Sequence, residues 1–170
     1  ERYGFGVGPM REALSQLVAE HLVIAINQKG YRVAPMSLEE MCDIYDARAN
    51  LEAMILTLAI KRGDDSWEAL ILASAHTLSK VVEVKTQDQM LDVWDERHKA
   101  FHSAIASGCG SKHLLQLRSQ LLDQAERYRH LWLKSTVFSE EALNKKRAEH
   151  AALVTSILAR DAERASVLMR

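Results

Sequence analysis

Three histidines of this sequence have the spacing to act together inside a helical protein. His98 and His102 are four residues apart in a segment expected to be helical, so both side chains project from one side and can grip one cation. His150 occupies an inward-facing position further along the chain. The apolar residues that define these two stripes are Met90, Trp94, Phe101 and Ile105 for the pair, and Leu143, Val154 and Ile157 for His150.

A metal site is one of two interpretations of this pattern. A histidine pair on a soluble helix is more often solvated or hydrogen-bonded than bound to metal, and the third inward-facing histidine makes the two interpretations equal. From the residues alone, a metal site and a hydrogen-bonded cluster both remain open. For a metal, zinc is the first candidate at a histidine-rich site, and nickel or another divalent ion is the alternative.

Arg48 is a candidate for binding an anion. It lies on an apolar helical stripe, and a buried guanidinium requires an anionic partner. That partner is either a ligand carboxylate, held through two parallel hydrogen bonds, or a protein acid such as Asp46 or Glu52. Tyr128 also lies on an apolar stripe, so its hydroxyl is expected in the same cavity with Arg127 beside it; ordinary aromatic packing is the alternative.

The patterns of known enzymes are missing from the sequence. A zinc peptidase with both histidines on one helix needs a glutamate directly after the first histidine, where it acts as the general base. In this sequence Lys99 occupies that position. We find no supported Ser-His-Asp or Cys-His set and no glycine loop for phosphate. We therefore expect a protein that is not an enzyme, with a helical-bundle metalloenzyme acting on a small carboxylate as the alternative.

Prolines and glycines divide the chain near residue 36. Both prolines and four of the seven glycines fall within the first 35 residues, and the remainder is rich in helix-forming residues. Ser37, with Glu40 three residues later, forms a capping box that starts a helix. We expect an antiparallel bundle of six or seven helices, at about residues 38–62, 65–84, 87–107, 111–134, 139–159 and 161 onward.

The first 36 residues predict a helix followed by a two-stranded wing. Pro9 suits the first turn of a helix, and the short β-type runs at 22–26 and 31–34 are separated by a hairpin signal. Arg11, in the first turn, can reach a guanine edge or a phosphate, and pairing with surface carboxylates is the alternative. Gly8, Lys29 and Gly30 complete the predicted DNA contacts, with Gly30 allowing close approach of the wing tip.

Composition limits the class of protein further. Hydrophobic residues make up 48% and charged residues 26% of the 170 residues, which is ordinary for a globular protein. No apolar run approaches the roughly 18 residues that cross a membrane, and the start is not a secretory signal, so we expect a cytoplasmic protein. Because the net charge is -1, any contact with nucleic acid must be local. Cys42 and Cys109 are expected to be free thiols.

Two groups of motifs resemble a family of regulators. Residues 3–14, Tyr-Gly-Phe-Gly-Val-Gly-Pro-Met-Arg-Glu-Ala-Leu, with Gly-Tyr-Arg-Val at 30–33, resemble the end of the helix-turn-helix and the wing of GntR-type regulators. Residues 36–170 resemble the FCD ligand-binding domain of the FadR branch. That second likeness rests on residues 43–48 with Leu51 and Glu52, on 101–105 leading to Gly110, and on 149–150 followed by 159–162.

The resemblance implies a helical bundle with a central cavity that binds an organic acid, often through a divalent metal. It favours the metal interpretation for His98, His102 and His150, and a ligand for Arg48. Metal-binding members of the family usually have Asp or Asn at the position of His98. The family's last histidine would lie about two residues beyond Arg170, and two helices would precede the helix that carries Arg11.

These observations lead to one expected organisation and function. Residues 1–36 are expected to be an N-terminally incomplete winged helix, and residues 37–170 an all-helical domain for effector binding and dimerisation. The protein is predicted to be a homodimeric transcription repressor that binds operator DNA under the control of a small organic acid. A dicarboxylate is the preferred candidate, because a second carboxylate can meet Arg48 while the first coordinates the metal.

Overall fold

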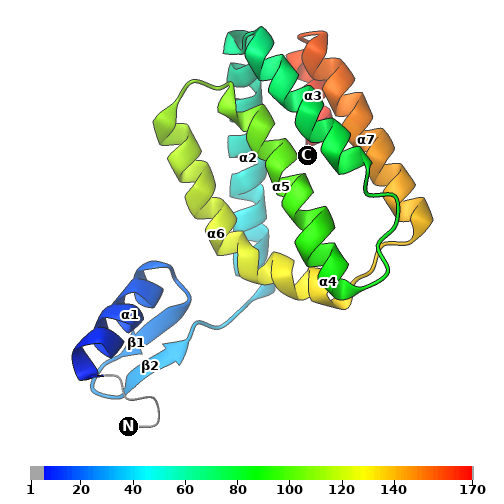
Figure 1. Cartoon of the computed structure of the whole chain (residues 1–170). Helices are drawn as coiled ribbons and strands as arrows, with labels where there is room; N and C mark the ends of the chain where they lie inside the picture. Colours follow the sequence, from blue (N-terminus) through cyan, green and yellow to red (C-terminus); the bar gives the residue numbers. More distant parts are fainter. Residues whose placement is uncertain (1–5, 170) are drawn as a thin grey trace. The chain divides into compact units, whose positions relative to one another are not determined.

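The computed structural model describes residues 6–169 and divides the chain into two compact units, one ending at Asp43 and the other beginning at Ile44. The chain is mainly helical, as expected (Figure 1). The division falls inside the helix α2, Leu38–Arg62. The predicted boundary at residues 36 and 37 thus coincides with the start of α2 rather than with the division itself.

The N-terminal unit contains the predicted helix and hairpin. Helix α1, Val7–Ala19, is followed by strands β1, Val23–Ile26, and β2, Gly30–Val33. The strands are antiparallel, with Val23 opposite Val33 and Ile26 opposite Gly30. Gly30 has a φ of +96°, which explains the need for glycine at the end of the turn.

The second unit is a bundle of long helices joined by short connections. Most helices begin where a Ser, Thr or Asp side chain accepts a hydrogen bond from a backbone N–H of the first turn; Ser37, Asp64, Thr86, Ser111 and Ser139 do so. After α2, the elements are α3 (Asp65–Ser79), α4 (Gln87–Gln89), the π-helix η1 (Met90–Asp95), α5 (Glu96–Ser107), α6 (Lys112–Ser135), α7 (Glu140–Leu158) and α8 (Ala162–Met169).

Two of the predicted helices differ from the structure. The helix expected over 65–84 ends at Ser79, and the following valine-rich segment runs outside regular helix with Val81 and Val84 buried in the core. The helix expected over 87–107 contains the π-turn of η1 between α4 and α5. The apolar stripe predicted for this segment is confirmed, because Met90, Trp94, Phe101 and Ile105 are all buried.

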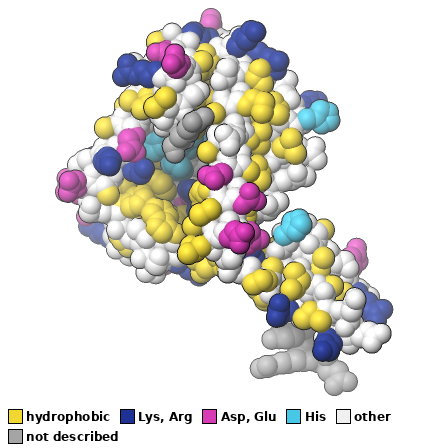
Figure 2. Space-filling view, turned by 180° about the vertical axis from the view of Figure 1, so that it is seen from behind, with side chains coloured by type: hydrophobic (Ala, Val, Ile, Leu, Met, Phe, Trp, Pro, Cys, Tyr) yellow, Lys and Arg dark blue, Asp and Glu magenta, His cyan; other side chains and the backbone are white. Residues whose placement is uncertain are grey.

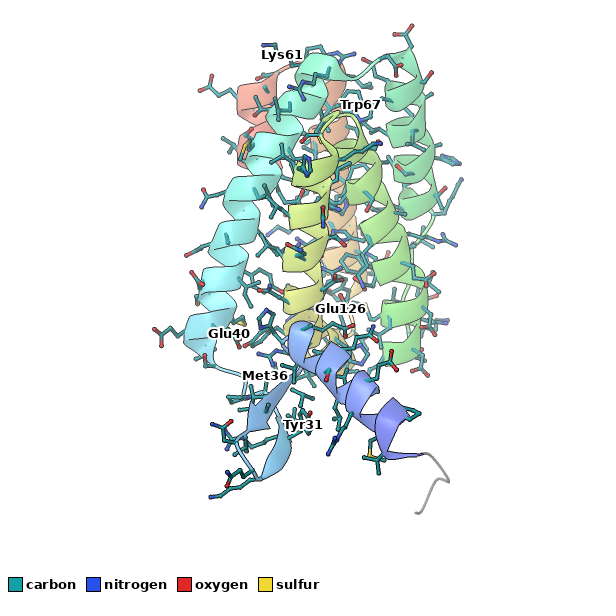
Figure 3. The ribbon with its side chains drawn as sticks, turned by 90° about the vertical axis from the view of Figure 1, so that its left-hand side faces the viewer. Tyr31, Met36, Glu40, Lys61, Trp67 and Glu126 are labelled. Carbon is teal, nitrogen blue, oxygen red and sulfur yellow. The ribbon has the colours of Figure 1, made fainter. Side chains whose placement is uncertain are left out.

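Trp67 contacts several helices at one end of the bundle, near Lys61 (Figure 3). Its indole Nε1 donates to the backbone carbonyls of Ala104 and Ile105, at 3.1 and 3.0 Å. The ring lies directly on Gly63 and Gly108, where a Cβ would overlap it. The guanidinium of Arg160 covers the ring at 5.4 Å from its centre and donates to the carbonyl of Ile60 at 2.7 Å. The ends of α2, α3, α5 and α7 therefore meet around one side chain.

We expect Gly63→Ala to lower the free energy of unfolding by about 1–3 kcal/mol, because the new methyl group overlaps the indole of Trp67. Trp67→Ala alone should cost about 3–5 kcal/mol. In the Trp67→Ala background, Gly63→Ala should cost clearly less, since the ring it meets is gone. Urea unfolding of the four proteins measures this coupling, and an equal cost of Gly63→Ala in both backgrounds would contradict it.

Candidate metal and effector site

The three predicted histidines meet in the interior of the helical unit. His98 and His102 come from α5 and His150 from α7, and one ring nitrogen from each lies within 4.8 Å of the others. The Nε2 atoms of His98 and His102 are 3.1 Å apart. Two nitrogen ligands of one tetrahedral zinc ion would be about 3.3 Å apart at the usual bond length of about 2.0 Å. The donor set and the spacing of this one pair therefore fit a divalent metal, and the same spacing also fits a hydrogen bond between the two rings.

Aromatic neighbours and burial keep these rings neutral. Trp94 stacks on His98 with ring centres 4.6 Å apart, and Phe101 contacts both His102 and His150 at 5.2 Å. Burial is the main cause that lowers the pKa of all three histidines, and with the neighbouring ring of His150 it lowers the pKa of His102 to about 3. Neutral imidazoles are the form that binds metal.

A buried acid lies beside the cluster. Asp95, the last residue of η1, is only 3% exposed. It forms an ion pair with Arg129 of α6, whose Nε donates to its Oδ1 at 2.7 Å, and a second with Lys99 at 2.9 Å. Nη2 of Arg129 also contacts Nδ1 of His98 at 3.2 Å. Asp95 is thereby connected to the histidine cluster through one guanidinium.

The cluster opens into a cavity of about 530 Å³ between α2, α5, α6, α7 and α8. Figure 2 shows histidine side chains inside a hollow on this face of the helical unit. Arg48 and Glu52 of α2 line the cavity opposite the histidines, and Arg118 and Arg129 contribute from α6. Leu122, Leu153 and the last residues of α8 supply its apolar walls.

Most cations of the cavity are paired with a carboxylate. Arg118 binds Glu52 at 2.9 Å, and Lys146 binds Glu149 at 2.9 Å; Arg129 and Lys99 share Asp95. Arg48 differs, because its Nε is buried and has no hydrogen-bond partner in the part of the chain that the structure describes. Burial lowers the pKa of Arg48, and the charge of Glu52 opposes this. Glu52, one of the protein partners expected for Arg48, is bound to Arg118.

Arg127 and Tyr128 are placed differently from the sequence expectation. Tyr128 is buried and its hydroxyl accepts a hydrogen bond from Arg127 at 3.2 Å, but neither residue lines the cavity. The face of α6 that does line it is offset by one residue and carries Arg118, Leu122, Ala125 and Arg129. Arg129 and Asp95 were not predicted, although Asp95, His98 and His102 follow one another at helical spacing.

The predicted DNA contacts lie in the N-terminal unit. Gly8 and Arg11 are exposed in the first turns of α1, which carries no acidic residue at its start. Lys29 is exposed in the turn between the two strands, and Gly30 is exposed at the start of β2.

Comparison with known proteins identifies the family. The FCD domain family matches residues 43–170. Over 169 residues the chain is 60% identical to the HTH-type transcriptional repressor GlaR of Escherichia coli K12, covering 99% of this chain and 77% of that protein. The chain belongs to the GntR-type regulators with an FCD domain. It is therefore a transcription regulator and not an enzyme, as the missing catalytic patterns predicted.

Other relatives agree with this assignment. The chain is 39% identical over 171 residues to the HTH-type transcriptional regulator BphR of Paraburkholderia xenovorans, covering 99% of this chain and 68% of that one. A GntR family member from Pseudomonas syringae has a TM-score of 0.61 at 26% identity over 95% of this chain and 63% of its own. Escherichia coli McbR/YncC, at 18% identity, shares the fold with a TM-score of 0.77, covering 99% of this chain and 76% of its own. Among the described residues, no helix is both long and apolar enough to cross a membrane.

We expect the metal-free FCD regulator to lose stability on acidification. The unfolded chain takes up protons on its histidines near pH 6.5, whereas the folded state keeps His102 neutral down to about pH 3. The free energy of unfolding should therefore fall as the pH drops from about 6.5 toward 3, by up to about 1.4 kcal/mol per pH unit for each such histidine.

Chemical unfolding between pH 7 and pH 5 in the presence of a chelator measures this slope. His102→Gln should make the slope shallower, and the same substitution at the exposed His113 is the control. A free energy of unfolding that does not change over this pH range would show that the histidines are not buried in the neutral form.

Proposed function

We propose that this regulator is a repressor whose DNA binding is controlled by a small organic acid, with a dicarboxylate preferred, bound in the cavity of the FCD domain together with a divalent metal. The observation that carries the proposal is the buried Nε of Arg48, which has no hydrogen-bond partner among residues 6–169, in a wall where the neighbouring cations are paired. A partly buried guanidinium with an unpaired N–H favours an anion beside it, and the cavity is large enough to admit one.

The histidine cluster supports the metal half of the proposal. His102, His150 and His98 would hold the ion, with zinc as the first candidate and nickel or another divalent ion as the alternative. When bound, such an ion supplies a Lewis-acidic position for a carboxylate oxygen. Neutral imidazoles leave the charge of a divalent cation uncompensated, so an anion is favoured beside it. An acid that places one carboxylate on the metal and a second on Arg48 is a dicarboxylate.

Helix α2 is the segment of the chain that links the effector-binding cavity to the DNA-binding unit. Arg48 lies on α2, which begins at Leu38, shortly after the wing strand β2 ends at Val33. An effector that draws Arg48 toward the histidines acts on the same helix that continues from the DNA-binding unit. In a homodimer on a two-fold operator, such a change alters how the two DNA-binding units are spaced.

We expect Arg48→Lys to weaken binding of a small dicarboxylate by about tenfold while leaving metal binding intact, because lysine keeps the charge but loses the bidentate fork. Calorimetric titration of metal-loaded protein with a series of mono- and dicarboxylates is the measurement. Arg62→Lys is the matched control, since Arg62 donates to the carbonyl of Cys109 outside the cavity. Equal affinities in wild type and Arg48→Lys, or no binding at millimolar acid, would refute the role of Arg48.

For the DNA half, we expect operator binding by the full-length regulator to fall steeply with salt, since phosphate contacts supply most of the affinity. Arg11→Ala should cost about 1–3 kcal/mol if Arg11 reads a guanine edge. Fluorescence anisotropy with operator and scrambled duplexes measures both effects, with the exposed neighbour Glu12→Ala as control. Binding that does not distinguish the duplexes and is unchanged by Arg11→Ala would contradict this assignment.

A further inference from the structure

Two of the three histidines, His150 and His98, have hydrogen-bond partners of opposite character. His150 forms a hydrogen bond with the backbone of Lys146, one turn earlier on α7. The outer nitrogen of His98, Nδ1, instead contacts Nη2 of Arg129 at 3.2 Å. A metal-bound histidine almost always donates its outer N–H to a carboxylate or a carbonyl, which leaves the other nitrogen free for the ion. The backbone partner of His150 is of this kind, whereas the guanidinium at Nδ1 of His98 is not.

The contact with Arg129 determines where the hydrogen of His98 lies. A guanidinium only donates hydrogen bonds, so Nδ1 of His98 must be the acceptor. In the neutral ring the hydrogen is then on Nε2, the atom that lies 3.1 Å from Nε2 of His102. His98 thus presents an N–H to the centre of the cluster, where a metal ligand must present a lone pair.

Several contacts hold this arrangement in place. Nη2 of Arg129 binds Asp95 and His98 together, and Nε of the same guanidinium donates to Asp95 at 2.7 Å. Asp95 is buried and is also bound by Lys99 at 2.9 Å. Trp94 stacks on the ring of His98, and Arg129 lies over Trp94 at 5.9 Å from its ring centre. The imidazole is therefore fixed on one face and at its outer nitrogen.

We propose that Arg129 is a positioning residue that withholds His98 from the metal, so that His102 and His150 are the standing ligands and His98 coordinates only when the guanidinium leaves its Nδ1. The ring hydrogen can then move from Nε2 to Nδ1, and Asp95, which shares Nη2 of Arg129 with His98, is the acceptor that remains beside it. This inference rests on the metal site of the proposed function and changes the role of one of its histidines.

A double-mutant cycle with Zn²⁺ alone tests the inference. In the wild-type background, His98→Ala should lower the Zn²⁺ affinity less than about threefold, because the ring is not a standing ligand. In the Arg129→Met background, the same change should cost about tenfold or more, as expected for loss of a ligand or its support. Competition with a chelating dye measures the affinities, and circular dichroism confirms that each variant is folded.

Arg118→Met is the matched control for charge. Arg118 lines the same cavity and is likewise paired with a carboxylate, Glu52, so its loss removes one cation from the wall while the Arg129–His98 contact stays intact. In this background His98→Ala should again lower the Zn²⁺ affinity less than about threefold. An equal cost of His98→Ala in all three backgrounds would overturn the inference while leaving the metal site in place, provided that His102→Ala abolishes binding. Absence of Zn²⁺ binding in the wild type would instead overturn the metal site and the inference together.

A second measurement does not depend on variants. Nitrogen-15 spectra of the histidine side chains report which ring nitrogen carries hydrogen. In chelator-treated and in Zn²⁺-loaded wild type, His98 should remain in the form with hydrogen on Nε2, while His102 and His150 change on loading. Hydrogen on Nδ1 of His98 in the loaded protein, with Nε2 bound to Zn²⁺, would contradict the proposal.

Discussion

The ion pair between Asp95 and Arg129 determines the polar centre of the helical domain. Asp95 is a fully enclosed carboxylate, and a buried charge of this kind is stable only with a partner of opposite sign. Arg129 supplies that partner from α6, and its guanidinium extends to His98 on α5. The pair joins η1 to α6 beside the histidines. The position of the His98 ring therefore depends on the ion pair between Asp95 and Arg129, although neither residue is one of the three histidines.

Much of the fold could be predicted from the sequence, because its signals are local. The helix starts at Leu38, Asp65 and Gln87 agree with the expected ones, and in each case a Ser, Asp or Thr side chain accepts a hydrogen bond from a backbone N–H of the first turn; of these caps, only Ser37 entered the prediction. Helix ends were less predictable. The segment with Val81 and Val84 has apolar residues that are compatible with a helix, but in the structure it lies outside regular helix with both valines buried in the core.

The site was predictable in part for a related reason. The histidines follow helical spacing, and they were found by it. Helix α6, however, has a wide apolar face, and periodicity alone does not say which edge of that face borders a cavity. The sequence predicts the stripe with Tyr128, whereas the neighbouring stripe with Arg118 and Arg129 lines the cavity. The pairing of Asp95 with Arg129 joins residues 34 positions apart, and no local pattern encodes it.

The contacts around Trp67 fix the C-terminal end of α2, at a distance from the part of the helix that lines the cavity. Trp67, Gly63 and Arg160 fix the C-terminal end of α2 against its neighbours, whereas Arg48 lies about 21 Å from that end and Leu38 about 36 Å, at about 1.5 Å per helical residue. In the proposed function, the end of α2 that Trp67 holds would stay in place while the part that carries Arg48 responds to the effector.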